Sequence, residues 1–135
     1  MKNENNKQNI ENKKLEIIPK VEKYIQYILE IIIKLPRTEK FNIGNEYKVS
    51  MYRTISNLMY LNKITEKSKC IYYANIIDAE INVQRIYLRI MYKNRWIDTK
   101  KFNIAMEQIY EIGKILRRVN KVLCQKQWKM YMKKI

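Results

Sequence analysis

Two arginines one helical turn apart, Arg85 and Arg89, are the residues of this sequence best suited to bind a ligand. Side chains at positions i and i+4 lie on one face of a helix, and a guanidinium group donates forked hydrogen bonds that match a phosphate. One turn before Arg85 stands the uncharged Asn82, and the acid on the same helical line, Asp78, is two turns away. An internal salt bridge from Arg85, the alternative to a phosphate contact, would have to span those two turns.

The residue types that most enzyme mechanisms require are missing or badly spaced. The chain contains no His, and its two glycines are too far apart for a glycine-rich phosphate-binding loop. Asp78 and Glu80 are two residues apart on an expected helix and therefore point in different directions. Glu107 and Glu111 share a face but lack the further ligands of a carboxylate metal site. We expect no catalytic residue, no metal site and no cofactor.

The charge of the chain favours a polyanionic partner. Its 135 residues, enough for one domain with a core, include 28 Lys and Arg against 13 Asp and Glu, so the formal net charge is +15. About half of this excess lies in residues 95–135. A genome rich in A and T would enrich Lys without any functional reason. It would account less well for the Arg residues, most of which come late in the chain.

The sequence also bears on the cellular compartment. Cys70 and Cys124 are far apart and form no CxxC pattern, so neither a disulfide framework nor a zinc site is expected. The N-terminus is polar and lacks the apolar segment of a signal peptide. The longest apolar run, residues 25–35, is interrupted by polar and charged residues. We expect a cytoplasmic protein without membrane contact.

Residues 68–93 are predicted to form one long helix, because they contain no Gly or Pro and carry two apolar stripes. The first stripe consists of Cys70, Ala74, Ile77, Ile81, Leu88 and Met91, with Gln84 as a polar break. The second consists of Tyr72, Ile76, Ala79, Val83, Ile86 and Ile90. One stripe packs a helix against its own fold, and a second stripe needs another partner. We therefore expect a homo-oligomer.

Three further helices complete the predicted fold. The first begins near Pro19, which suits a first turn, and ends before Pro36; the second spans about residues 42–62. Asn42, Thr65 or Ser68, and Asp98 are the predicted N-caps of the last three helices. The last helix has an apolar stripe from Phe102 to Leu123.

The architecture that these helices predict is an all-α, up-down-up-down four-helix bundle over residues 17–123. A flexible basic arm, residues 1–16, is expected before it, and a basic aromatic tail, residues 124–135, after it. Gly113 lies inside the last helix, where Gly costs about 1 kcal/mol relative to Ala. We expect it to permit a tight crossing with a neighbouring helix.

Three stretches of the chain resemble one known family in their order and spacing. They are Leu35-Pro36-Arg37 followed by Gly44, Asp78-Ala79 followed by Arg85 and Leu88-Arg89, and Glu111-Ile112-Gly113-Lys114-Ile115-Leu116. Together they resemble the accessory proteins of diversity-generating retroelements, the accessory variability determinants or Avd. The four-helix proteins linked to intervening sequences in rRNA are relatives of that family. The resemblance covers about residues 17–123.

This resemblance implies both an assembly and a function. Such accessory proteins form ring-shaped homopentamers of four-helix protomers with a basic surface and pore. They have no active site, but they bind the retroelement's reverse transcriptase and template RNA and are needed for mutagenic cDNA synthesis. Arg85 and Arg89 look like the family's basic pair on the third helix, and Lys114 looks like the basic position after the Glu-Ile-Gly stretch.

Our hypothesis is therefore a non-catalytic accessory subunit that holds template RNA and cDNA near a reverse transcriptase, largely through phosphate contacts. The predicted nucleic-acid-binding residues are Arg85, Arg89, Lys93, Arg95, Lys114, Arg117, Arg118 and Lys121. Two alternatives are an rRNA-associated bundle of the intervening-sequence type and a protein-interaction bundle whose charge is only compositional. A membrane-surface helix is disfavoured, because residues 68–93 are apolar on two sides.

Overall fold

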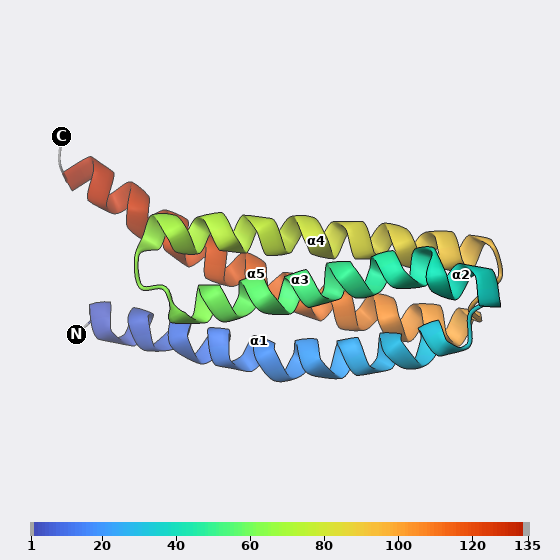
Figure 1. Cartoon of the computed structure of the whole chain (residues 1–135). Coiled ribbons are helices and arrows are strands. Elements are labelled where there is room, and N and C mark those ends of the chain that lie inside the picture. The colour runs from blue at the N-terminus through green and yellow to red at the C-terminus, as the bar shows by residue number, and fades with distance from the viewer. Residues whose placement is uncertain (1, 134–135) are drawn as a thin grey trace.

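The structure, a computed structural model, describes the backbone of residues 2–133 and the side chains of residues 16–120. The elements in chain order are α1 (Lys2–Ile33), α2 (Arg37–Phe41), α3 (Ile43–Lys63), α4 (Lys67–Lys93) and α5 (Thr99–Lys133). The four long helices run in alternating directions, and both ends of the chain lie at the same end of the bundle (Figure 1). α3 packs on α4, α4 on α5 and α5 on α1, which confirms the predicted up-down-up-down bundle.

The largest difference from the prediction concerns the beginning of α1. The helix starts at Lys2 rather than near Pro19, so the backbone of residues 2–16 is helical where a flexible arm was expected. Pro19 therefore lies inside the helix and donates no hydrogen bond to the carbonyl of residue 15. Residues 2–18 contain no Gly or Pro, so nothing in their sequence stops the helix from extending back to Lys2.

The later helices begin close to the predicted positions, but the predicted N-cap residues do not all make a capping hydrogen bond. Only Asp98 is confirmed as an N-cap: its Oδ1 accepts a hydrogen bond from the backbone N–H of Lys101 at 2.7 Å. Asn42 occupies the N-cap position of α3 but makes no side-chain cap hydrogen bond. Glu66, rather than either residue predicted, occupies that position in α4, also without a cap bond. The stretch expected to be a loop before Asn42 contains the short helix α2.

The hydrophobic core follows the periodicity of the sequence. Every residue of the first α4 stripe is buried, including Gln84. From α5, the buried residues are Ala105, Ile109, Ile112, Ile115, Leu116 and Val119. Apolar residues three and four positions apart lie on one side of a helix, so each long helix presents such a row to the others.

A buried hydrogen-bond network lies within this apolar core and joins three helices. Gln84 of α4 accepts a hydrogen bond from the Tyr24 hydroxyl of α1 at 3.0 Å, and its Nε2 donates to Ser50 Oγ at 3.0 Å and Thr54 Oγ1 at 2.9 Å in α3. The hydroxyls of Tyr24 and Tyr47 are 2.5 Å apart. Burial raises the pKa of both phenols above the usual tyrosine value, so both stay protonated and able to donate.

We expect Gln84→Ala to lower the free energy of unfolding by about 3 kcal/mol, because it removes three buried hydrogen bonds and opens a cavity. The measurement is chemical denaturation followed by circular dichroism. Gln108→Met is the matched control, since Gln108 Oε1 is buried with no hydrogen-bond partner among the described residues. That control should keep or raise the stability. Equal losses in the two variants would show that the network contributes nothing specific.

Candidate nucleic-acid interface

The second apolar stripe of α4 lies on the surface of the protomer, opposite the core. Tyr72 is 61% exposed, Ile86 50% and Ile90 40%, and Ala79 between them is also exposed. Only Ile76 is half-buried. A continuous apolar row on one helix face is uncommon in a protein that stays monomeric. The structure thus places this stripe where another chain could reach it.

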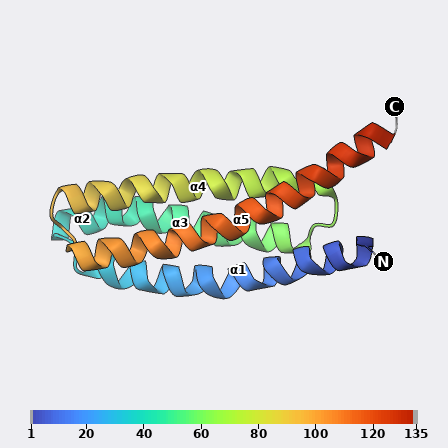
Figure 2. The ribbon, with the colours of Figure 1, turned by 180° about the vertical axis from the view of Figure 1, so that it is seen from behind.

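Beside this stripe, polar residues of α4 meet α5 along a line that we call the α4–α5 seam. Its residues are Asn75, Asn82, Arg85 and Tyr92 of α4 with Thr99, Phe102, Gly113, Arg117 and Asn120 of α5. Asn120 Nδ2 donates a hydrogen bond to Asn75 Oδ1 at 3.1 Å near one end. At the other end, the rings of Tyr92 and Phe102 stack with centroids 4.3 Å apart. In Figure 2, which shows the bundle from behind, α5 lies in front and runs beside α4.

The centre of the seam is occupied by two guanidinium groups above Gly113. A Cβ at Gly113 would lie 2.9 Å from Nη2 of Arg85 and 3.4 Å from Nη1 of Arg117. The expectation of a tight helix crossing at Gly113 is therefore wrong. The space that the missing side chain leaves is filled by arginine heads, not by the backbone of a neighbouring helix.

Arg85 does not make the salt bridge that was the alternative to a phosphate contact. Its Nη1 donates a hydrogen bond to Asn82 Oδ1 at 2.8 Å, and neither it nor Asp78 forms an ion pair within residues 16–120. The charge of Arg85 reaches the buried Tyr24 hydroxyl, where it partly opposes the rise in pKa that burial causes. Arg85 is thus a half-buried cation whose hydrogen-bond partner, Asn82, is uncharged.

The other predicted residues divide into two groups. Arg89 and Lys93 follow Arg85 along α4 and are exposed. Lys114 and Arg118 lie instead near Glu111, which accepts a hydrogen bond from Lys20 of α1 at 2.8 Å. That bond lowers the pKa of Glu111 below the usual value, and the charges of Lys20, Lys114 and Arg118 add to the effect. These two cations therefore have an acidic neighbour, whereas no ion pair joins Arg85 or Arg117 to an acid within residues 16–120.

Two predictions fall on residues whose side chains lie outside the described part of the chain. They are the RNA contact assigned to Lys121 and the basic aromatic tail at residues 124–135. The backbone there continues α5 as far as Lys133, and its last turns diverge from the other helices in both views (Figures 1 and 2).

Arg95 occupies a position that normally favours glycine. Its φ is 61°, and it is the only non-glycine residue with positive φ among those described. The Trp96 N–H donates to the carbonyl of Met91 and the Arg95 N–H to that of Tyr92, which is the hydrogen-bond pattern of a Schellman cap. A side chain in this left-handed conformation costs energy, so Arg95 is kept here at the expense of stability.

Because glycine adopts this conformation without strain, we expect Arg95→Gly to raise the free energy of unfolding by about 1 kcal/mol. Lys93→Gly, in the last turn of α4, is the matched control. It should lower that free energy by about 1 kcal/mol, since Lys93 has ordinary helical geometry. Denaturant titration of both variants measures the difference. A loss of stability in Arg95→Gly would contradict this interpretation of the cap.

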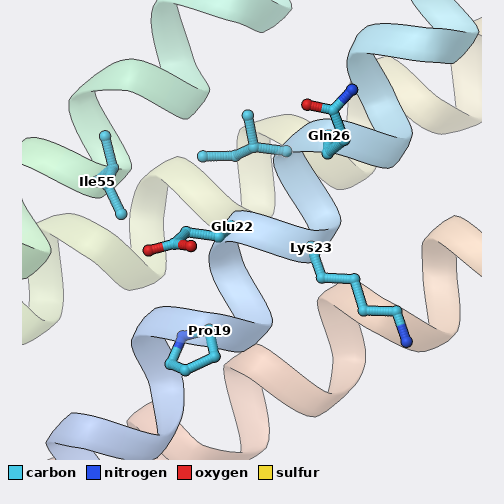
Figure 3. A pocket seen from close by; sticks show the side chains of 6 residues that line it. Pro19, Glu22, Lys23, Gln26 and Ile55 are labelled. Atoms are coloured by element: carbon cyan, nitrogen blue, oxygen red, sulfur yellow. The ribbon is translucent and has the colours of Figure 1, made fainter.

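The described residues give no support for a metal site or a membrane span. Among these residues, no group of three or more His, Cys, Asp or Glu side chains could hold a metal ion. No described helix has the length and apolarity needed to cross a bilayer. An open hollow of about 580 Å³ lies between α1 and α3. In Figure 3 the Glu22 carboxylate points toward Ile55 and the Lys23 ammonium points away, so acid and base do not converge.

Comparison with known proteins agrees with this fold. A solved structure, described as a protein with unknown function from the S23 ribosomal protein family from Bacteroides thetaiotaomicron VPI-5482, superposes with a TM-score of 0.74. The alignment has 18% identity and covers 81% of this chain and 98% of that one, so it supports the fold alone. No curated protein matches the chain. The family model described as bAvd-like matches residues 12–123, and the chain therefore belongs to the bAvd-like family, as its resemblance to accessory variability determinants predicted.

Proposed function

We propose that this protein is a non-catalytic accessory subunit of a diversity-generating retroelement. It acts in the cytoplasm, where it binds the retroelement's reverse transcriptase and template RNA and supports mutagenic cDNA synthesis. The observation that carries this proposal is the bAvd-like match over residues 12–123, because it covers the whole bundle apart from the first turns of α1 and the end of α5.

The exposed stripe of α4 supports self-association as part of this function. From Tyr72 to Ile90 it extends over about 27 Å of helix, enough to pack along a helix of a second copy. Burying it would remove several large apolar side chains from water, among them Val83 and Ile86. We propose that the copies form a ring-shaped homopentamer through this stripe, which is the assembly implied by the resemblance to Avd proteins.

The charge distribution supports RNA as the second partner. Each copy carries a net charge of +15, so an assembly of several copies repels itself until a polyanion neutralises it. Arg85 and Arg89 are about 6 Å apart along the α4 axis and border the stripe, so RNA could run along the helix beside the subunit contact. The proposed RNA-binding residues are Arg85, Arg89, Lys93, Arg95, Lys114, Arg117, Arg118 and Lys121.

For the assembly, we expect Ile86→Glu to dissociate the oligomer into protomers, because it places a charge in the middle of the stripe. Light scattering coupled to gel filtration gives the mass, and circular dichroism checks that helicity is retained. The matched control is Ile33→Glu, which changes an isoleucine of α1 that is 64% exposed. Ile33→Glu should keep the wild-type mass. An unchanged mass in Ile86→Glu would exclude this stripe as the contact.

For the function, the protein is co-expressed with the retroelement's reverse transcriptase and template region, and the RNA that co-purifies is sequenced. We expect both the polymerase and the template RNA to be recovered. The double variant Arg85→Ala/Arg89→Ala should carry less RNA and should flatten the salt dependence of binding by about 1.4 units of slope, since two phosphate contacts are lost.

The control for this double variant is Lys23→Ala/Lys34→Ala, which removes the same charge from an exposed position on α1 and from one directly after it, and which should bind RNA nearly as the wild type does. Recovery of rRNA instead of template RNA would favour the rRNA-associated alternative. A purified complex free of RNA at low salt would leave only the protein-interaction bundle.

A further inference from the structure

Two positively charged groups are held together at the centre of the α4–α5 seam. Nη2 of Arg85 and Nη1 of Arg117 lie 2.9 and 3.4 Å from the same point above the Gly113 backbone. Like charges at this separation repel each other, and the repulsion is stronger for a half-buried group than in bulk water. A nearby carboxylate or an anionic ligand would relieve this repulsion.

No described carboxylate forms an ion pair with these two arginines. Within residues 16–120, neither Arg85 nor Arg117 takes part in an ion pair. The acid nearest to Gly113 in the sequence, Glu111, is hydrogen-bonded to Lys20 of α1. Asp78, which lies on the same line of α4 between Asn75 and Asn82, forms no ion pair with either arginine, so no described carboxylate holds the two groups in a salt bridge.

Each guanidinium is instead positioned by a neutral partner. Asn82 Oδ1 accepts one hydrogen bond from Arg85, and Arg117 lies over the ring of Tyr110 with its Cζ 5.9 Å from the centroid. A guanidinium has five N–H donors, so these contacts orient both groups and leave donors for a ligand. Gly113 has no side chain that could separate the two groups, so its backbone lies directly beneath them.

We infer that Arg85 and Arg117 form a clamp for one phosphodiester group of the RNA chain, with Gly113 as its floor and Asn82 as the residue that positions Arg85. This inference rests on the proposed function for the identity of the ligand. The clamp uses forked hydrogen bonds to the two non-bridging oxygens and reads no base. It differs from Lys114 and Arg118, which add to the attraction between protein and RNA but have an acidic neighbour.

Gly113→Ala tests the clamp without changing the net charge. The added Cβ would come within 2.9 Å of Arg85 Nη2 and must displace that guanidinium. Alanine is also the better helix former, so the fold is retained, and circular dichroism and thermal melting verify this. The probe is a fluorescently labelled oligo(U) of about 15 nucleotides, long enough for an extended single-strand contact. Its affinity is followed by anisotropy at low salt.

We expect Gly113→Ala to weaken oligo(U) binding about tenfold, as the loss of a charge-assisted hydrogen-bond pair does. Arg118→Ala is the matched control. It removes a full charge from the same helix outside the clamp and should weaken binding only about twofold, as an exposed charge does. Asn82→Ala should weaken binding by an intermediate factor, and Arg117→Lys should lose more than Arg118→Ala although its charge is retained.

Two results would overturn the clamp. One is wild-type affinity in Gly113→Ala together with loss of affinity in Arg85→Ala, which would make Arg85 an ordinary surface charge. The other is displacement of oligo(U) by inorganic phosphate at an equal concentration of phosphate groups, which would indicate a site for free anions. Neither result affects the proposed function, which fails separately if the reverse transcriptase and template RNA do not co-purify with the wild-type protein.

Discussion

The side chain of Gln84 fixes how α4 is rotated about its own axis, and the rest of the surface depends on that rotation. Its amide hydrogen-bonds Tyr24, Ser50 and Thr54 inside the core, where each unmade bond would be costly. Successive helical residues are about 100° apart, so Arg85 must point toward α5 once Gln84 points inward. The same rotation turns Ile86 and the rest of its stripe away from the core. The buried amide of Gln84 thus determines the direction of two faces of α4, the one that carries Arg85 and the one that carries Ile86.

The distribution of acids decides which cations remain available to a ligand. Glu111 pairs with Lys20, and Glu80 accepts a hydrogen bond from Ser50 and forms a salt bridge with Arg53, whose Nε lies 3.1 Å from the Glu80 carboxylate. The two ion pairs join α1 to α5 and α3 to α4 by opposite charges, as is usual in a helical bundle. The seam lacks such a contact within the described residues, and there the arginines face one another. Net charge alone, +15 for the chain, would not have distinguished these two regions.

The sequence predicts those parts of this structure that depend on local periodicity. The two stripes of α4 and the cap at Asp98 could be read directly, because helical spacing and a cap hydrogen bond involve neighbours in the chain. The start of α1 was wrong because Pro19 suits a first turn but does not require one. The contact between Arg85 and Gly113 could not be predicted, since it depends on the relative rotation of two helices. The left-handed backbone at Arg95 had no glycine to signal it.

The arrangement of α4 implies that subunit contact and RNA binding are coupled under the proposed function. The apolar stripe and the line through Arg85 and Arg89 are neighbouring faces of one helix, so association of copies through the stripe brings their arginines together. That repulsion opposes assembly, and bound RNA relieves it, so each process favours the other. Salt then has opposite effects on the two steps. It screens the repulsion between free protomers and promotes their association, whereas it weakens the phosphate contacts and releases the RNA.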